Sequence, residues 1–201
     1  MTPVSTITSP GVPLLIDNID TDTIIPSREM RSTGRTGLAD GLFASWRYSD
    51  ADKRIQDPAF VLNQRDAIGT RLLLAGKNFG CGSSREHAVW ALAEFGIEAI
   101  IAPSFAPIFK NNCIRNGLLP VELPEDVVRE LNWAMVVIDL AAQTVKVGDK
   151  TWRFAIDDEA KTMLLEGLDA IDLTLKHRRT IAAWTDADRA ARPWVYLEKR
   201  A

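Results

Sequence analysis

The chain has 201 residues, of which 46% are hydrophobic and 25% are charged, and its formal net charge is −3. This length suffices for one buried core and is too short for two large ones, while the charge balance excludes a global attraction to nucleic acid or anionic lipid. No apolar stretch approaches the roughly 18 residues that span a bilayer, and the first residues lack the basic and apolar parts of a secretory signal, so we expect a cytoplasmic protein without membrane contact.

Cysteine and histidine are scarce. Cys81, Cys113, His87 and His177 are all that the chain contains. They lack the paired spacing that a zinc site or an iron–sulfur cluster requires. We therefore expect this chain to bind no metal ion or cluster on its own.

The first part of the chain, residues 12–48, is rich in Asp, Thr, Arg and Gly and shows no long helical period. It is predicted to form a short strand, a turn and a long loop. Asp20 and Asp22 are expected to hold turns through bonds from the backbone to their side chains. Later in the loop three arginines crowd into eight residues with little apolar cover, and such a loop either is solvated or binds an anion.

The middle of the chain predicts a strand, a helix and a second strand. The apolar run "RLLLA" at 71–75 is typical of a buried strand. Between residues 84 and 95 the apolar residues recur at spacings of three and four, which predicts a helix that Gly96 ends. Residues 97–104 again indicate a strand. A right-handed crossover joins two such strands as parallel neighbours.

The second half predicts a helix over 105–116, strands over 135–139, 144–147 and 151–155, and mostly helix over 159–190. The last two strands meet at Gly148 and Asp149, a typical hairpin pair. The predicted fold class is therefore α/β with a mixed sheet. Residues 1–201 are expected to form a single domain with a C-terminal helical extension.

The stretch "GKNFGCGSSREHA", residues 76–88, concentrates glycine, serine, Arg85 and His87 in front of the predicted helix. It matches neither a nucleotide P-loop nor a dinucleotide fingerprint, and neither serine has the flanking glycines of a nucleophile elbow. The spacing of Ser83 and Glu86 predicts a capping box at the helix start. A capping box does not require three glycines, a second serine or an arginine.

These additional residues suit an anion. Glycines allow successive backbone amides to converge, and the helix N-terminus adds a partial positive charge. Arg85 can bind a carboxylate with a bidentate fork. A serine hydroxyl held as an alkoxide in that field could act as a base. The stretch therefore predicts a site of proton abstraction with a carboxylate clamp.

The motif "NFGCGSSREHA" resembles the signature of the small, swivelling domain of the aconitase superfamily, and the chain as a whole resembles the small subunits of 3-isopropylmalate dehydratases. The resemblance implies a three-layer β/β/α swivelling domain, like the C-terminal domain of aconitase. It also implies a hydro-lyase of leucine biosynthesis that interconverts 2- and 3-isopropylmalate by dehydration and rehydration. Further stretches agree with it: "DNIDTDTIIP" (17–26), "RTGLADGLFASWR" (35–47), "DPAFVLN" (57–63), "SFAPIFKNNCIRNGLLPVEL" (104–123) and "LLEGLDAIDLTL" (164–175).

The resemblance further implies a partner, a large subunit that carries a 4Fe-4S cluster, in a heterodimer or heterotetramer. Ser83 would remove the proton α to a carboxylate, and Arg85 would bind a substrate carboxylate and stabilise the serine alkoxide. Ser84 would be a further carboxylate ligand. In the loop, Arg35 is the first choice for another substrate arginine and Arg31 the second, with a solvated basic loop as the alternative reading of both. Iron in the partner would take the leaving hydroxyl.

One departure leaves the substrate open. After Ile-Ile-Pro these small subunits often carry bulky apolar residues, whereas this chain has "SREMRSTGRTG" at 27–37. A related hydratase acting on maleate, citraconate or dimethylmaleate is therefore an alternative, and a non-catalytic binding module is another. His87 is expected to be structural rather than a base, and Cys81 to be a small packed residue.

Overall fold

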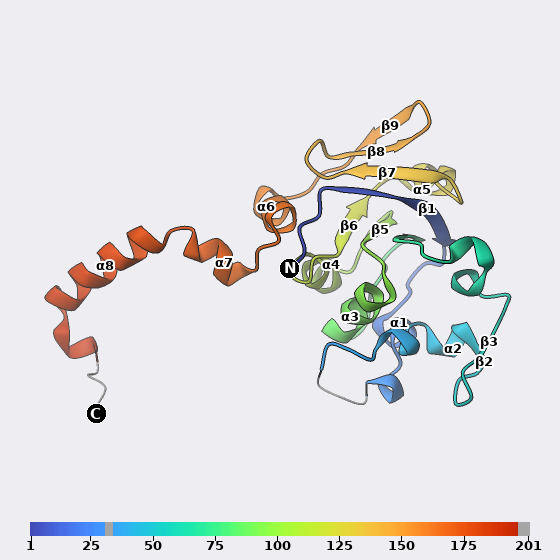
Figure 1. Ribbon diagram of the computed structural model, residues 1–201, viewed down its shortest axis with the longest axis horizontal. Helices are drawn as coiled ribbons and strands as arrows, with labels where there is room; N and C mark the ends of the chain where they lie inside the picture. The colour runs from blue at the N-terminus through green and yellow to red at the C-terminus, as the bar shows by residue number, and fades with distance from the viewer. Residues whose placement is uncertain (31–33, 197–201) are drawn as a thin grey trace.

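The computed structural model describes residues 1–30 and 34–196, and within this range the main sheet has seven strands in the order β6-β5-β4-β1-β7-β8-β9 (Figure 1). β1 pairs in parallel with β4 and antiparallel with β7, so it joins a parallel half of the sheet to an antiparallel half. A small second sheet pairs β2 (Tyr48–Asp50) with β3 (Ile55–Gln56). The strands of the main sheet are β1 (Thr6–Leu14), β4 (Leu72–Ala75), β5 (Ala99–Ala102), β6 (Leu119–Glu122), β7 (Met135–Asp139), β8 (Thr144–Val147) and β9 (Lys150–Arg153).

Local sequence signals mark one terminus each of α3, α4 and α6. Pro107 occupies the first turn of α4, Asp157 caps α6 through two backbone amides, and Gly96 ends α3 with a positive φ of 106°. The helices are α1 (Thr21–Ile24), α2 (Ala44–Arg47), α3 (Glu86–Phe95), α4 (Pro107–Arg115), α5 (Glu125–Glu130), α6 (Asp158–Glu166), α7 (Ala170–Leu175) and α8 (Arg178–Ala191).

Two apolar cores separate three layers. Alternate residues of the parallel strands face α3 and α4 in one core, and the remaining ones face the antiparallel strands in the other. Figure 1 shows β7, β8 and β9 on one side of the parallel strands and α3 and α4 on the other. The sheet is thus curled so that its two halves pack against each other. The predicted α/β class with a mixed sheet is confirmed, and the layering is that of the β/β/α arrangement.

The strand, helix and strand predicted over 71–104 are confirmed as β4, α3 and β5, and the two strands pair in parallel. The predicted bounds of β7 and β8 are also confirmed. The first strand, however, begins at Thr6 and not at residue 12. Its prolines, Pro10 and Pro13, argue against a central strand, but each half of β1 pairs with only one neighbour, so a missing N–H is tolerated.

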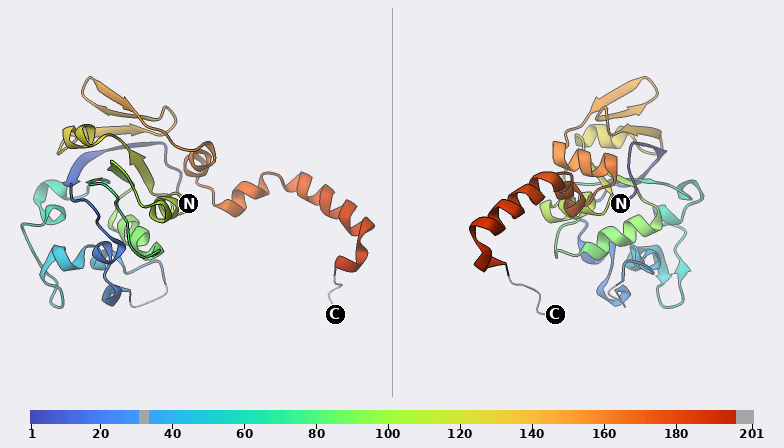
Figure 2. Two further views of the ribbon diagram at one scale, coloured as in Figure 1. Left: turned by 180° about the vertical axis from the view of Figure 1, so that it is seen from behind. Right: turned by 60° about the vertical axis from the view of Figure 1, so that its left-hand side comes forward.

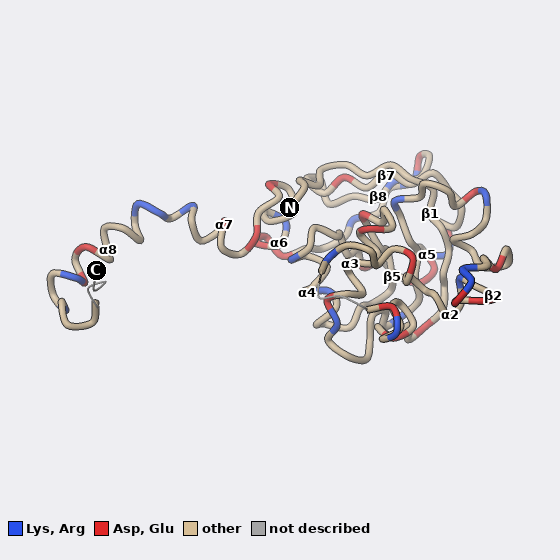
Figure 3. The backbone as a smooth tube through the Cα atoms, turned by 60° about the horizontal axis from the view of Figure 1, so that its bottom comes forward, with Lys and Arg blue, Asp and Glu red and all other residues tan. Residues whose placement is uncertain are grey.

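The last two helices project from the body as an arm, which Figures 1 and 2 show from three directions. No residue of α7 or α8, both lying within the described range, is buried, and Trp184 is 61% exposed. The predominantly helical structure predicted for 159–190 is confirmed. Figure 3 shows basic and acidic residues interspersed over body and arm, in keeping with the small net charge. The described part of the chain contains no helix with the length and the apolar composition that spanning a bilayer requires.

Candidate active site

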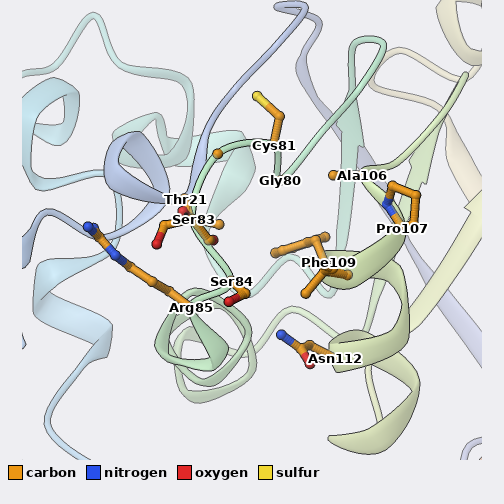
Figure 4. A pocket seen from close by; sticks show the side chains of 12 residues that line it. Thr21, Gly80, Cys81, Ser83, Ser84, Arg85, Ala106, Pro107, Phe109 and Asn112 are labelled. Carbon is orange, nitrogen blue, oxygen red and sulfur yellow. Dashed lines mark hydrogen bonds between the residues drawn. The ribbon is translucent and has the colours of Figure 1, made fainter.

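A cavity of about 210 Å³ lies where the loop after β4 meets the start of α4. It is lined by residues 80–85, by 106–109 with Asn112, and by Thr21 of α1 (Figure 4). The structure therefore brings Ser83, Ser84 and Arg85 together in one cavity. The apolar wall opposite them comes from Phe109 and its neighbours on α4.

Residues 18–21 hold residues 80–85, the serine loop, mainly through hydrogen bonds between backbone atoms. The Gly80 amide donates to the Ile19 carbonyl (2.8 Å), and the Thr21 amide donates to the Cys81 carbonyl (2.9 Å). The Thr21 hydroxyl donates to the Ser83 carbonyl (2.9 Å). The hydroxyls of Ser83 and Ser84 form no hydrogen bond with the described residues, so the loop is fixed while both hydroxyls stay available to a ligand.

Two glycines of this loop have positive φ angles, 75° at Gly80 and 89° at Gly82. A Cβ added at Gly80 would lie 2.1 Å from Cγ of Phe109. Only glycine combines this backbone conformation with so close an approach of the aromatic wall. The glycine-rich sequence thus lets the loop lie directly against α4.

The predicted capping box is wrong. Helix α3 begins at Glu86, its N-cap residue is Arg85, and no side chain caps it. The Glu86 carboxylate instead accepts a hydrogen bond from Nδ2 of Asn116 (2.7 Å), and the Arg85 amide donates to the Ser83 carbonyl (2.8 Å) in a tight turn. Because the first amides of a helix carry partial positive charge, this uncapped end favours an anion beside the serines.

Arg85 forms an ion pair with Asp22 of α1, and its side chain is 25% exposed. Figure 4 shows the Arg85 side chain running toward the Ser83 side of the loop, whereas Ser84 lies on the side of Asn112. Asp20 accepts a hydrogen bond from the Thr23 amide (2.7 Å), so the predicted bond between its side chain and the backbone is present. It caps the short helix α1, however, where a turn was predicted. The prediction for Asp22 is wrong, because its carboxylate binds side chains, among them Arg85.

Sequence patterns did not reveal Thr21, Asp22 or Asn112 as members of the site. The repeated aspartate of "DTD" was the available signal for Asp22. It could not be interpreted because its partner, Arg85, is 63 residues away in the chain. Thr21 carries no signal of its own, since threonine is common at the start of helices.

Arg35, the last of the three arginines in residues 28–35 (the arginine-rich loop), lies farther along α3. The Arg35 guanidinium lies 5.1 Å from the centroid of the Trp90 ring, and Arg35 is not among the residues that line the cavity. Arg31 lies outside the described residues. The His87 ring also contacts Trp90, with centroids 4.7 Å apart. The roles expected for Arg35, Arg31 and His87 stay predictions.

The unusual stretch after Ile25 and Pro26 directs one of its charges inward. Glu29 is buried, and its carboxylate accepts from Nη2 of Arg54 at 2.5 Å. Nε of Arg28 lies 3.5 Å from the same carboxylate. Glu29 therefore does not present a free negative charge to a substrate.

The two cysteines lie in different surroundings. Cys113 is fully buried, and burial raises the pKa of its thiol well above the ordinary value. Cys81 lines the cavity and is half-buried. Over residues 1–30 and 34–196, no three His, Cys, Asp or Glu side chains are grouped so that they could hold a metal ion.

Residues 1–126 match the family described as "Aconitase C-terminal domain". The chain is 53% identical over 197 residues to the 3-isopropylmalate dehydratase small subunit of Cupriavidus necator, an alignment that covers 94% of this chain and 95% of that one. It is also similar to the crystal structure of a 3-isopropylmalate dehydratase from Methanocaldococcus jannaschii. That likeness has a TM-score of 0.67 at 31% identity and covers 90% of this chain and 99% of the other.

Proposed function

Since the chain belongs to the family of 3-isopropylmalate dehydratase small subunits, within the aconitase C-terminal domains, we propose that it joins a large subunit to isomerise 2- and 3-isopropylmalate. The reaction is removal of water to an alkene and readdition of water at the neighbouring carbon. The observation that supports this proposal is the cavity in which Ser83, Ser84 and Arg85 meet the uncapped start of α3. A diacid is the kind of ligand that such a set of donors favours.

Ser83 is the proposed base. A serine hydroxyl is far too weak an acid to ionise in water, so its alkoxide needs nearby positive charge. The helix N-terminus and the Arg85 guanidinium both supply that charge at the loop. The Thr21 hydroxyl donates to the Ser83 carbonyl, which fixes the orientation of Ser83 and leaves the Ser83 hydroxyl unused.

The proton, the electrons and the leaving group can then be followed. The Ser83 alkoxide takes the proton from the carbon α to a carboxylate, the C–H electrons form the double bond, and hydroxide leaves the neighbouring carbon. Addition of water in the opposite sense completes the isomerisation. We also propose that the 4Fe-4S cluster lies in the large subunit and supplies Lewis-acid chemistry there.

Arg85 and Ser84 are the proposed carboxylate ligands in the cavity. Arginine has five N–H donors, so Arg85 can keep Asp22 as a partner while it binds a carboxylate with its remaining donors. Asp22 thus holds the guanidinium beside the serine loop before substrate arrives. From the arginine-rich loop we propose Arg35 first, and Arg31 second, as further substrate-binding arginines. The assembly is proposed to be a cytoplasmic heterodimer or heterotetramer.

A second candidate is a hydratase of a smaller diacid such as maleate, citraconate or dimethylmaleate. The observation that favours it is the loop after Pro26, where Glu29 turns inward to Arg54 and the half-exposed Arg28 follows Ser27. Its described part, residues 27–30, offers little aliphatic surface for an isopropyl group, because Met30 packs against the core. The two candidates share Ser83, Ser84 and Arg85 and differ only in the substrate side chain.

The test is reconstitution of this chain with a cluster-bearing large subunit, followed by the ultraviolet absorbance of the alkene. We expect turnover of 3-isopropylmalate. Turnover of maleate or citraconate alone would establish the second candidate instead. Failure to form a complex with any cluster-bearing large subunit would contradict both and favour a non-catalytic binding module.

A further inference from the structure

Glu94, in the last turn of α3, binds three consecutive backbone amides, those of residues 37–39, directly after the arginine-rich loop. Its Oε1 accepts from the Gly37 amide at 2.7 Å, and its Oε2 accepts from the amides of Leu38 and Ala39 at 2.5 and 2.9 Å. Burial raises the pKa of Glu94, but the three hydrogen bonds from backbone amides outweigh this effect, so the pKa lies below its ordinary value. The carboxylate is therefore ionised near neutral pH and both of its oxygens are used.

Residues 37–39 are held to α3 at a second place. Nη1 of the buried Arg47 donates to the Ala39 carbonyl (2.7 Å), and its guanidinium lies 4.9 Å from the centroid of the Phe95 ring. Leu38 is only 1% exposed. Residues 37–39 are thus fixed by an ionised acceptor on one side and a buried guanidinium on the other.

Arg35 stands two residues before this anchored segment, with its guanidinium over Trp90. Trp90 precedes Glu94 by four residues and so lies on the same face of α3. Arg85 lies at the start of that helix, about 7.5 Å along the axis from Trp90 at 1.5 Å per residue. One rigid helix therefore sets the place of Arg85 and, through Trp90 and Glu94, the place of Arg35.

We propose that Glu94 is a positioning residue for substrate binding: it fixes residues 37–39 on α3 and so determines where Arg35 meets the anionic substrate. This inference rests on the proposed function, in which Arg35 binds the substrate. Glu94 touches neither the cavity nor the serine loop. Its loss should therefore weaken substrate binding and leave the chemical step intact.

The experiment compares Glu94→Gln with Glu98→Gln in the reconstituted complex. Glu98 is a matched control because it follows the same helix and binds a side chain, Arg71, instead of the loop. We expect Glu94→Gln to raise KM about tenfold with kcat within about twofold, because an amide offers one acceptor where the carboxylate offers two. Glu98→Gln should change neither value. Glu94→Asp, which keeps the charge but shortens the reach, should give an intermediate KM.

A double-mutant cycle with Arg35→Ala separates positioning from general destabilisation. We expect Glu94→Gln to add little to the KM of Arg35→Ala, since it acts through Arg35. Full additivity, or an unchanged KM in Glu94→Gln while Arg35→Ala raises KM, would overturn the inference and leave the proposed role of Arg35 standing. An unchanged KM in Arg35→Ala would instead refute the substrate role of Arg35 and the inference with it.

Trypsin supplies a readout that does not depend on activity. Cleavage after Arg35 should be about tenfold faster in Glu94→Gln than in Glu98→Gln. The reason is that residues 37–39 detach more readily from α3 once their hydrogen bonds to Glu94 are lost. Equal cleavage rates would contradict the anchoring.

Discussion

Replacement of Gly80 by alanine tests how the serine loop is held against α4. Gly80 and Gly69 share a φ of 75°, but a Cβ at Gly69 meets nothing within 4 Å, whereas at Gly80 it meets the Phe109 ring at 2.1 Å. Phe109 cannot easily withdraw, because its ring packs edge-on against buried Phe79 at a centroid distance of 5.4 Å. Gly69→Ala is therefore a matched control that carries the backbone strain alone.

The magnitudes follow from these two contributions. An alanine at positive φ costs about 1–2 kcal/mol, so Gly69→Ala should lower the free energy of unfolding by that amount. Overpacking adds about 1–3 kcal/mol, which gives a loss of roughly 2–5 kcal/mol for Gly80→Ala. With a urea m-value of about 2 kcal/mol per molar, the midpoint should fall by roughly 0.5–1 M in the control and 1–2.5 M in Gly80→Ala.

Urea unfolding followed by tryptophan fluorescence measures these midpoints, and the alkene assay measures kcat/KM of the complex. Since Gly80 and Phe109 both line the cavity, Gly80→Ala should also lower kcat/KM, and Gly69→Ala should not. Equal urea midpoints for the two variants would refute the close packing of the loop on α4. A lower midpoint with unchanged kcat/KM would refute its importance for the site.

The surroundings of the two thiols and of the arm lead to further expectations. Iodoacetamide should alkylate Cys81 in the folded chain and inactivate the complex. Cys113 should react only after unfolding, because it is buried and the pKa of its thiol is raised. Mass spectrometry of the labelled peptides checks both expectations, and early labelling of Cys113 would contradict the second. Truncation after Asp169 should leave the Tm of the remaining body within a few degrees, since α7 and α8, all of whose residues are described, contribute no buried residue. A large fall in Tm would show that the arm belongs to the core.

Local patterns were sufficient for the elements that build the sheet. The strands β4 and β5 are continuous apolar runs, and α3 has one apolar face ended by Gly96, so each is determined by its own residues. The first half of β1 escaped prediction because its Pro10 is tolerated only through the switch from antiparallel to parallel pairing, which follows directly after it. That switch is a property of the sheet and cannot be read from the strand.

In the site, too, local sequence predicted some features, whereas others depend on contacts between distant segments. The glycines, the second serine and Arg85 before a predicted helix suggested an anion site, which stays a prediction, and the structure brings Ser83, Ser84 and Arg85 into one cavity. The pairing of Arg85 with Asp22 and the binding of the loop amides by Glu94 join segments that lie more than fifty residues apart. The capping box failed because the Ser83 carbonyl forms a turn with the Arg85 amide, which delays the helix to Glu86.

The assignment of Ser83 as the base is tested most directly by Ser83→Ala in the reconstituted complex, with Ser84→Ala as the neighbouring control. Assembly should be unchanged, because the Thr21 bond goes to the Ser83 carbonyl, which alanine retains. The predicted result is a loss of about 10²–10⁴-fold in kcat for Ser83→Ala and a much smaller loss for Ser84→Ala. An intact complex in which Ser83→Ala turns over 3-isopropylmalate within twofold of the parent would contradict the assignment.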